Sequence, residues 1–134
     1  MKIPAQILAR QREITTNFQR HIAAHLQDIV SGKATEMFEI RDIAALMFLH
    51  PTHLSNTIKL VTGKAPCYFF ETQIMDIARN MLQDSSRSIS SIAVQLTYDP
   101  SNFTKFFKHF EGCTPKQYRE AWLARQQKTE TVTI

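Results

Sequence analysis

The chain has 134 residues and a mass of 15.5 kDa, of which 43% are hydrophobic and 21% charged. This length suits one ordinary domain or two very small ones. Because glycine and proline contribute only 3 and 5 residues, the composition excludes collagen-like, low-complexity and largely disordered chains. The net charge of +4 favours a polyanionic partner without proving one.

The cysteines and the hydropathy of the sequence indicate in which cellular compartment the protein is found. The two cysteines, Cys67 and Cys113, form no CxxC pair, which indicates ordinary reduced thiols. The longest apolar run, Ile43–Leu49, is much shorter than the roughly 20 residues that cross a bilayer, and polar side chains interrupt the N-terminus early. We therefore expect a cytoplasmic protein with no membrane partner.

Residues 1–36 are predicted to form an N-terminal amphipathic helix and its connection. The helix should run from about Ala5 to Val30 and end at Ser31 and Gly32. One face carries Ile14, Phe18, Ile22, Leu26 and Ile29. Residues up to about Arg12 are polar enough to project from the core or bind another chain. We expect His21 and His25 to be exposed on this helix.

The next part of the chain contains a repeat. We expect a first unit over residues 37–66 and a second unit, with a closing helix, over residues 87–126. Shifting the sequence by 49 positions aligns residues 40–66 with residues 89–115 without a gap. The matched pairs are Ile40/Ile89, Ile43/Ile92, Ala44/Ala93, Pro51/Pro100, Thr52/Ser101, Leu54/Phe103, Ser55/Thr104, Ile58/Phe107, Lys59/Lys108, Gly63/Gly112 and Pro66/Pro115. Any two amphipathic helix pairs share some apolar spacing, but the coincident prolines, lysines and glycines favour a duplicated unit.

Each unit has the pattern of a short helix, a tight turn and a second helix. Apolar residues recur at helical spacing, and we assign the four phenylalanines of the second unit to its core: Phe103, Phe106, Phe107 and Phe110. Asp99 is the predicted N-cap before Pro100. The second helices should end at Gly63 and Gly112, with a proline opening the next helix. Two helix-turn-helix units result.

Residues 67–86 should form a linker helix and a loop. The 19 residues from Pro66 to Asp84 would span roughly 28 Å as a helix, comparable with the roughly 34 Å of one DNA turn. Two units could then face successive turns of DNA. After the closing helix, with Tyr118, Ala121 and Trp122 packed, we expect residues 127–134 to be frayed.

Several of these segments closely resemble the DNA-binding domain of the AraC/XylS family of bacterial transcription regulators. The resemblance covers about Phe38 to Trp122 and is most specific in DPSNFTKFFK followed by GCTPKQYR. It implies an all-α fold of two helix-turn-helix subdomains joined by a linker helix, here with an extra long N-terminal helix. It also implies sequence-specific binding at promoters and contact with RNA polymerase.

The chain departs from the family pattern at three places. Thr97 stands where the family usually has glycine, and the turn at Tyr98–Pro100 is one residue shorter than usual, so we expect an altered second turn. Met75 lies near a linker position that is often arginine. We expect no sensory domain before residue 1, and the family's usual control by a small molecule is therefore not carried over.

The predicted DNA-contacting residues lie on the second helix of each unit, on the face opposite its apolar stripe. The resemblance assigns base reading to Thr52, Ser55, Asn56, Ser101, Asn102, Thr104 and Lys105. Asn56 could pair with adenine and Lys105 with guanine. We assign phosphate contacts to Lys59, Lys64 and Lys108. No acidic residue occurs between positions 43 and 70 or between 100 and 110, as closeness to phosphate requires.

Other chemistry has weaker support. His50, His53 and Cys67 do not supply four metal ligands, and neither a catalytic triad nor a phosphate-binding glycine loop can be assembled. We therefore expect no metal, no cofactor and no enzymatic activity. The alternative function is a helical protein-association module paired with a separate sensor and binding DNA weakly. A homodimer or a partner protein bound through the N-terminal helix stays open.

Overall fold

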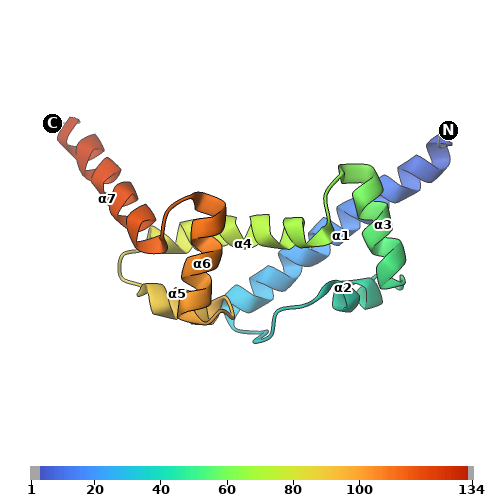
Figure 1. Cartoon of the computed structure of the whole chain (residues 1–134), viewed down its shortest axis with the longest axis horizontal. Coiled ribbons are helices and arrows are strands. Elements are labelled where there is room, and N and C mark those ends of the chain that lie inside the picture. Colours follow the sequence, from blue (N-terminus) through green and yellow to red (C-terminus); the bar gives the residue numbers. More distant parts are fainter. Residues whose placement is uncertain (1–3, 133–134) are drawn as a thin grey trace. The chain divides into compact units, whose positions relative to one another are not determined.

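A computed structural model describes residues 4–132, which form helices and no strands (Figure 1). In chain order the helices are α1 (Ala5–Ser31), α2 (Ile40–Leu46), α3 (Pro51–Thr62), α4 (Pro66–Leu82), α5 (Ile89–Gln95), α6 (Pro100–Glu111) and α7 (Pro115–Val132). The all-α prediction, with its long N-terminal helix, is confirmed. No helix in this part of the chain is long and apolar enough to span a membrane.

The chain divides into two compact units, Met1–Gln73 and Ile74–Ile134. The division falls within α4, and therefore within the segment 67–86 predicted as linker helix and loop. One unit contains α1, α2, α3 and the start of α4, and the other contains the rest. The segment boundaries given above for the complete chain remain predictions.

The 49-residue repeat is reproduced in the helix boundaries. Helices α2 and α5 both have 7 residues, α3 and α6 both have 12, and each start and end in the second unit lies 49 positions after its counterpart. Both second helices begin at a proline and end at a left-handed glycine, Gly63 with φ 74° and Gly112 with φ 87°. The prolines and glycines that recur in the sequence therefore mark the starts and ends of these helices.

The residue before each of those prolines caps its helix. The Asp99 carboxylate accepts hydrogen bonds from the backbone N–H groups of Ser101 and Asn102, at 3.1 and 3.3 Å, which confirms the predicted N-cap. His50 has the same role in the first unit, where its Nδ1 accepts from the Thr52 N–H at 3.1 Å. The imidazole nitrogen must be unprotonated to accept this bond.

The two turns have equal length and the same backbone conformation. Phe48 and Thr97, which are 49 residues apart, both have left-handed conformations, with φ of 58° and 70°. The next N–H in each turn donates to the carbonyl of Ala44 or Ala93, at 2.9 and 2.8 Å. The second turn is thus not altered relative to the first, because Thr97 adopts the conformation that glycine would favour.

Replacing Thr97 with glycine should stabilise the second unit. A β-branched residue in the left-handed region costs about 1–2 kcal/mol of folding free energy, and glycine removes this cost. The greater freedom of glycine in the unfolded chain offsets part of the resulting stabilisation. We expect a higher midpoint of thermal unfolding for the Thr97→Gly variant, measured by circular dichroism. Ser101→Gly is the control, since Ser101 has no positive φ and should give no gain. An unchanged or lower midpoint for Thr97→Gly would contradict the assigned strain.

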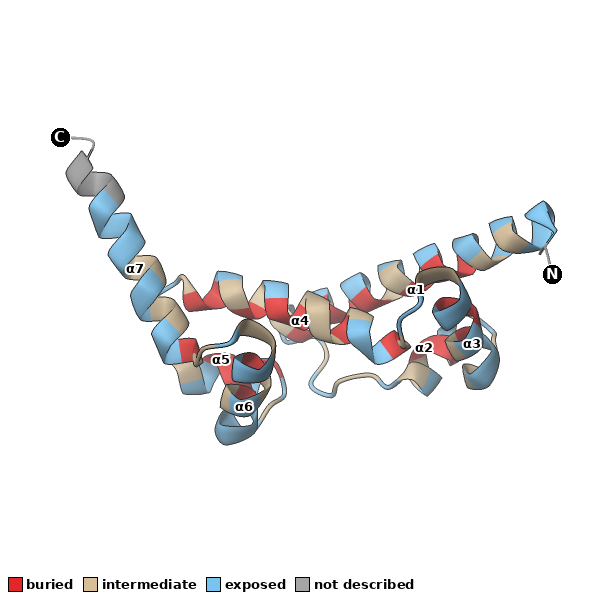
Figure 2. Ribbon diagram, turned by 45° about the horizontal axis from the view of Figure 1, so that its top comes forward, coloured by how far each residue is buried: buried red, intermediate tan, exposed pale blue. Residues whose placement is uncertain are grey.

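The first unit has its core on one face of α1 (Figure 2). The predicted stripe of α1 is buried, beginning at Ile14, whereas residues 4–13 are exposed or half-buried, as expected. Phe18 is fully buried. Its ring packs edge-on against the rings of Phe69 and Phe70, with centroid distances of 6.3 and 6.2 Å. The helix-turn-helix contributes the fully buried residues Ile43, Ala44, Leu54 and Ile58.

The prediction that His25 is exposed is wrong, since only 4% of the residue is exposed. Its ring stacks on Phe38 with centroids 3.8 Å apart, and its Nε2 accepts the Phe38 N–H at 2.9 Å. This bond fixes the connection between α1 and α2. Burial lowers the pKa of His25 from its ordinary value of 6.5, against the opposing effect of Asp28 and Asp42.

Acidification should therefore destabilise the first unit. Because the pKa of His25 is lower in the folded chain, the unfolded chain binds more protons, and stability falls as the pH drops below 6.5. We expect the unfolding midpoint of this unit to decrease between pH 7.5 and 5.5. His25→Leu should lose part of this pH dependence while lowering stability by about 1–3 kcal/mol, because the Phe38 N–H is left unpaired. His21→Gln, four residues away, should retain it, and equal curves for the two variants would contradict the assignment.

The second unit is built around α4, α5 and α6. Its fully or almost fully buried residues include Met75, Ala78, Leu82, Ile92, Ala93, Leu96, Phe103 and Phe107. Met75, which departs from the family pattern, is thus a core residue. The assignment of all four phenylalanines to the core needs correction, because Phe106 and Phe110 are only half-buried. Phe106 stacks on Tyr98 with centroids 5.1 Å apart, so these rings form the edge of the core.

Helix α7 continues to Val132, into the segment 127–134 for which we expect fraying, and residues 133–134 lie outside the described residues. The frayed tail stays a prediction. Tyr118 and Trp122 are half-buried, whereas Ala121 is exposed. The Arg119 guanidinium donates to the carbonyls of Leu82 and Asp84, at 2.8 and 3.1 Å. These bonds hold the start of α7 to the end of α4.

Candidate nucleic-acid interface

Helix α3 has a buried face and a polar face. Leu54, Thr57 and Ile58 are buried, while Thr52, Asn56 and Lys59 are exposed and Ser55 is half-buried. At 100° per residue, the three exposed side chains lie within about 60° of one another and opposite the buried stripe. The predicted base-reading residues of the first unit are therefore brought together on one accessible surface.

Helix α6 repeats this arrangement. Ser101, Asn102, Lys105 and Lys108 are exposed, and Thr104 is half-buried. Phe103 and Phe107 anchor the opposite face. Every residue that the sequence assigned to base reading is accessible on its helix, and none lies in the core.

Local hydrogen bonds constrain the hydroxyl groups of Ser101 and Thr104. The Ser101 hydroxyl donates to the Asp99 carboxylate at 2.8 Å, and the Thr104 hydroxyl donates to the Pro100 carbonyl at 3.1 Å. Their oxygen lone pairs are then the groups best placed to contact a base, as acceptors. The Ser101 bond, followed by the backbone bonds, lowers the pKa of Asp99, so the N-cap position just before α6 carries a negative charge.

The predicted phosphate contacts differ in their surroundings. Lys59 and Lys108 are exposed in the last turns of α3 and α6, where the helix dipole also favours a cation. Lys64 lies beyond the end of α3, and its Nζ is 5.3 Å from the centre of the Tyr68 ring. With no carboxylate between positions 43 and 70, this surface suits a polyanion, and it is more uniformly basic than the start of α6.

One candidate was missed in the sequence. His53 is exposed on α3 and corresponds to Asn102 under the 49-residue shift. The repeat was the signal that could have identified it, but His53 was considered only as a metal ligand. Among the described residues, no three His, Cys, Asp or Glu side chains are grouped to hold a metal ion.

The described elements thus form two helix-turn-helix units whose second helices present polar, largely acid-free faces. A family model for a helix-turn-helix domain matches residues 43–121, from within α2 to within α7, and so contains the turn and the second helix of both helix-turn-helix units. The chain belongs to the AraC-type helix-turn-helix family of DNA-binding transcription regulators. The protein-association alternative is not favoured.

Two bacterial relatives illustrate the match. The regulatory protein PocR of Salmonella typhimurium is 31% identical over 102 residues, which cover 75% of this chain and 31% of PocR. The HTH-type transcriptional regulator YisR of Bacillus subtilis is 28% identical over 99 residues, covering 73% of this chain and 33% of YisR. The chain therefore spans about a third of the length of these relatives.

The fold is also found in solved structures. The DNA-binding domain of AdpA, a global transcriptional factor crystallised with a target DNA, superimposes with a TM-score of 0.66. The match has 23% sequence identity and covers 81% of this chain and 96% of that domain. At this identity the likeness establishes the fold.

Proposed function

We propose that the chain binds promoter DNA by placing α3 and α6 in successive major-groove segments. The side chains of Thr52, Ser55 and Asn56 would read bases in one segment, and those of Ser101, Asn102, Thr104 and Lys105 in the other. Lys59, Lys64 and Lys108 would bind phosphates. The major groove accepts a helix and presents a different donor and acceptor pattern for each base pair.

The observation that carries this proposal is the matched geometry of the two second helices. Their boundaries, caps and turns repeat after 49 residues, while most of their exposed side chains differ. A common framework with different polar surfaces suits two readers of different base sequences. An accessory packing surface would not require the acid-free faces of α3 and α6.

Selection from a random duplex library at moderate salt, followed by sequencing, tests the proposal. Enrichment of two short motifs about one helical turn apart, roughly 10 base pairs, is the expected result. A single motif would restrict base reading to one unit. No enrichment, together with binding that disappears as salt rises, would leave only non-specific attraction to DNA and overturn the proposal.

The relatives extend the proposal beyond DNA contact. PocR and YisR carry names of regulators, and we infer that this chain regulates transcription, with RNA polymerase as a second partner. Promoter DNA is a cytoplasmic partner, which agrees with the free thiols of Cys67 and Cys113. We assign a binding function rather than a catalytic one.

A further inference from the structure

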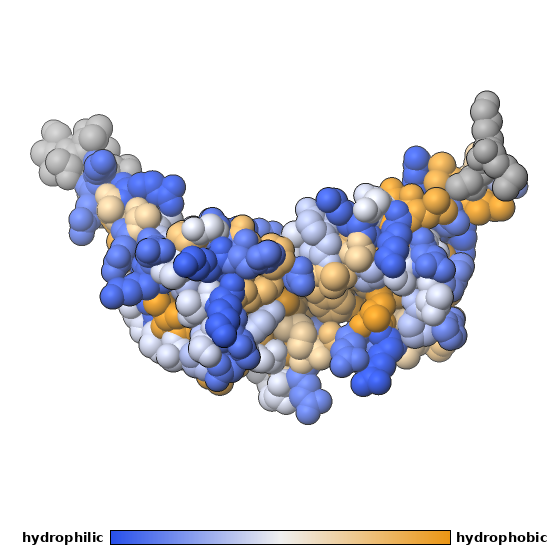
Figure 3. Space-filling view, in the orientation of Figure 1, coloured by the Kyte–Doolittle hydropathy of each residue, from blue (hydrophilic) through white to orange (hydrophobic). Residues whose placement is uncertain are grey.

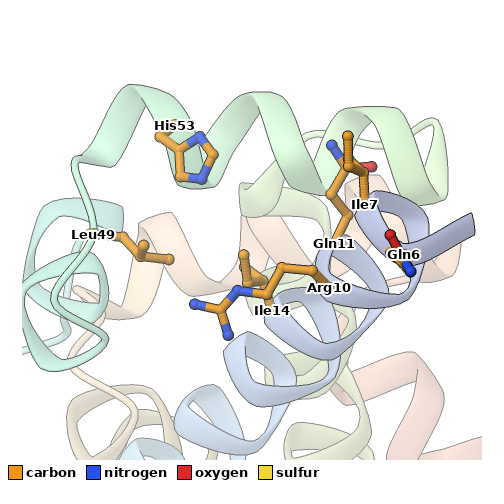
Figure 4. Close-up of a pocket in the computed structure, with 7 residues that line it drawn as sticks. All are labelled: Gln6, Ile7, Arg10, Gln11, Ile14, Leu49 and His53. Carbon is orange, nitrogen blue, oxygen red and sulfur yellow. The ribbon is translucent and has the colours of Figure 1, made fainter. Parts of the chain in front are cut away.

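A groove lies between the N-terminal half of α1 and the start of α3 (Figure 4). Its volume is about 310 Å³, and it is lined by Gln6, Ile7, Arg10, Gln11, Ile14, Leu49 and His53. None of these side chains is acidic. Figure 4 shows Arg10 extending from α1 toward the side of the groove where Leu49 lies, with His53 on the opposite helix.

The groove adjoins the proposed base-reading surface. His53 follows Thr52 directly and precedes Asn56 by three residues, so it lies at the border between the exposed face of α3 and the side covered by α1. When a recognition helix occupies the major groove, the elements beside it approach the sugar-phosphate strands. The mouth of this groove is therefore where a flanking strand would pass.

Arg10 is available for such a contact. Its side chain is 65% exposed, and its ion pair with Glu13 is long, at 3.9 Å, and equally open to solvent. Arg79 in the second unit provides a contrast. It is paired with Glu111 at 2.7 Å and Asp76 at 3.0 Å, and only 33% of its side chain is exposed. The Arg79 guanidinium is therefore occupied by carboxylates of its own unit, whereas Arg10 can exchange its weak ion pair with Glu13 for a stronger one with a phosphate.

We propose that α1 is part of the DNA interface, with Arg10 binding a backbone phosphate beside the site of α3 and His53 donating a second hydrogen bond to the same strand. This inference rests on the proposed function and extends its footprint beyond the two recognition helices. The hydrophobic surface at the first turns of α1 suggests an apolar peptide as another occupant (Figure 3). Arg10 and the acid-free lining favour an anion.

Arg10→Gln in the complete chain tests the inference on the duplex enriched by the library selection, with binding followed by fluorescence anisotropy across a salt series. Loss of one phosphate contact should reduce the slope of log affinity against log salt by about 0.9. Affinity should fall equally for the enriched duplex and for one with altered base motifs. Hydroxyl-radical footprinting should show lost protection beside the motif assigned to α3.

Arg12→Gln is the matched control, because Arg12 is exposed on the same helix but does not line the groove. It removes the same charge and should leave the footprint intact. Equal effects of the two variants on slope and footprint would overturn the inference. Lys59→Gln separates the inference from the function on which it rests. If Lys59→Gln weakens binding and Arg10→Gln does not, the groove has another occupant, whereas absent enrichment for the wild-type chain means that the proposed function itself has failed.

Discussion

Replacing Asn56 and Lys105 together with alanine is expected to abolish most of the preference for the selected duplex over a scrambled one. Each side chain can form a specific contact with a base edge worth about 1–3 kcal/mol, or roughly 5-fold to 150-fold in discrimination. Because the residues belong to different units, their losses should be nearly additive. Competition binding at fixed salt measures this preference, and the single variants test the additivity.

The fold should survive these substitutions, since both side chains are exposed. Circular dichroism and the unfolding midpoint serve as the check on structure. Asn80→Ala and Lys116→Ala provide controls, because both residues are exposed on helices without a proposed base contact. A double variant that keeps the full sequence preference would show that the base-reading residues are wrongly assigned.

Phe103→Ala is expected to have the largest effect on stability. Phe103 is fully buried, and truncating a buried phenylalanine costs about 3–5 kcal/mol through lost burial and the cavity that remains. A unit of this size has a total stability of roughly 3–9 kcal/mol. The second unit should then be partly or largely unfolded at 37 °C. Amide hydrogen exchange should report the loss at Ile92 and Phe107, with Leu54 and Ile58 still protected.

Phe106→Ala separates the core from its edge. Phe106 is half-buried against Tyr98, so its truncation removes a ring contact without leaving a closed cavity. We expect less than half of the destabilisation caused by Phe103→Ala. Equal losses of stability for the two variants would show that Phe106 is a core residue. In the Phe103→Ala variant, loss of hydrogen-exchange protection at Leu54 would show that the two units unfold together.

Helix ends and repeats were predictable because they depend on local chemistry. Pro51, Pro100, Gly63 and Gly112 impose backbone restrictions that act wherever they occur in the chain. The same reasoning located the Asp99 cap. For His50 it indicates only a residue that can turn or cap, because histidine caps a helix only when its ring adopts a particular rotamer with an unprotonated nitrogen facing the N–H.

Burial was harder to predict wherever it depends on neighbouring elements. Periodicity places Phe103, Phe106 and Phe107 in related positions, but the helices that pack against α6 cover only part of its circumference. His25 was expected at the surface because nothing adjacent in the sequence shows that Phe38 folds back over it. The proposed DNA-contacting residues can be predicted from the sequence as a polar face, whereas the groove beside them depends on the packing of α1 on α3.

The two recognition helices share one framework, yet Asn56 in the first corresponds to Lys105 in the second. A symmetric dimer bound to a palindrome would read the same half-site twice. Under the proposed function, one chain that uses both α3 and α6 would instead read two unlike half-sites in a fixed order. Its target would then have polarity along the promoter, and inverting that target would reverse the orientation of the bound protein relative to the start of transcription.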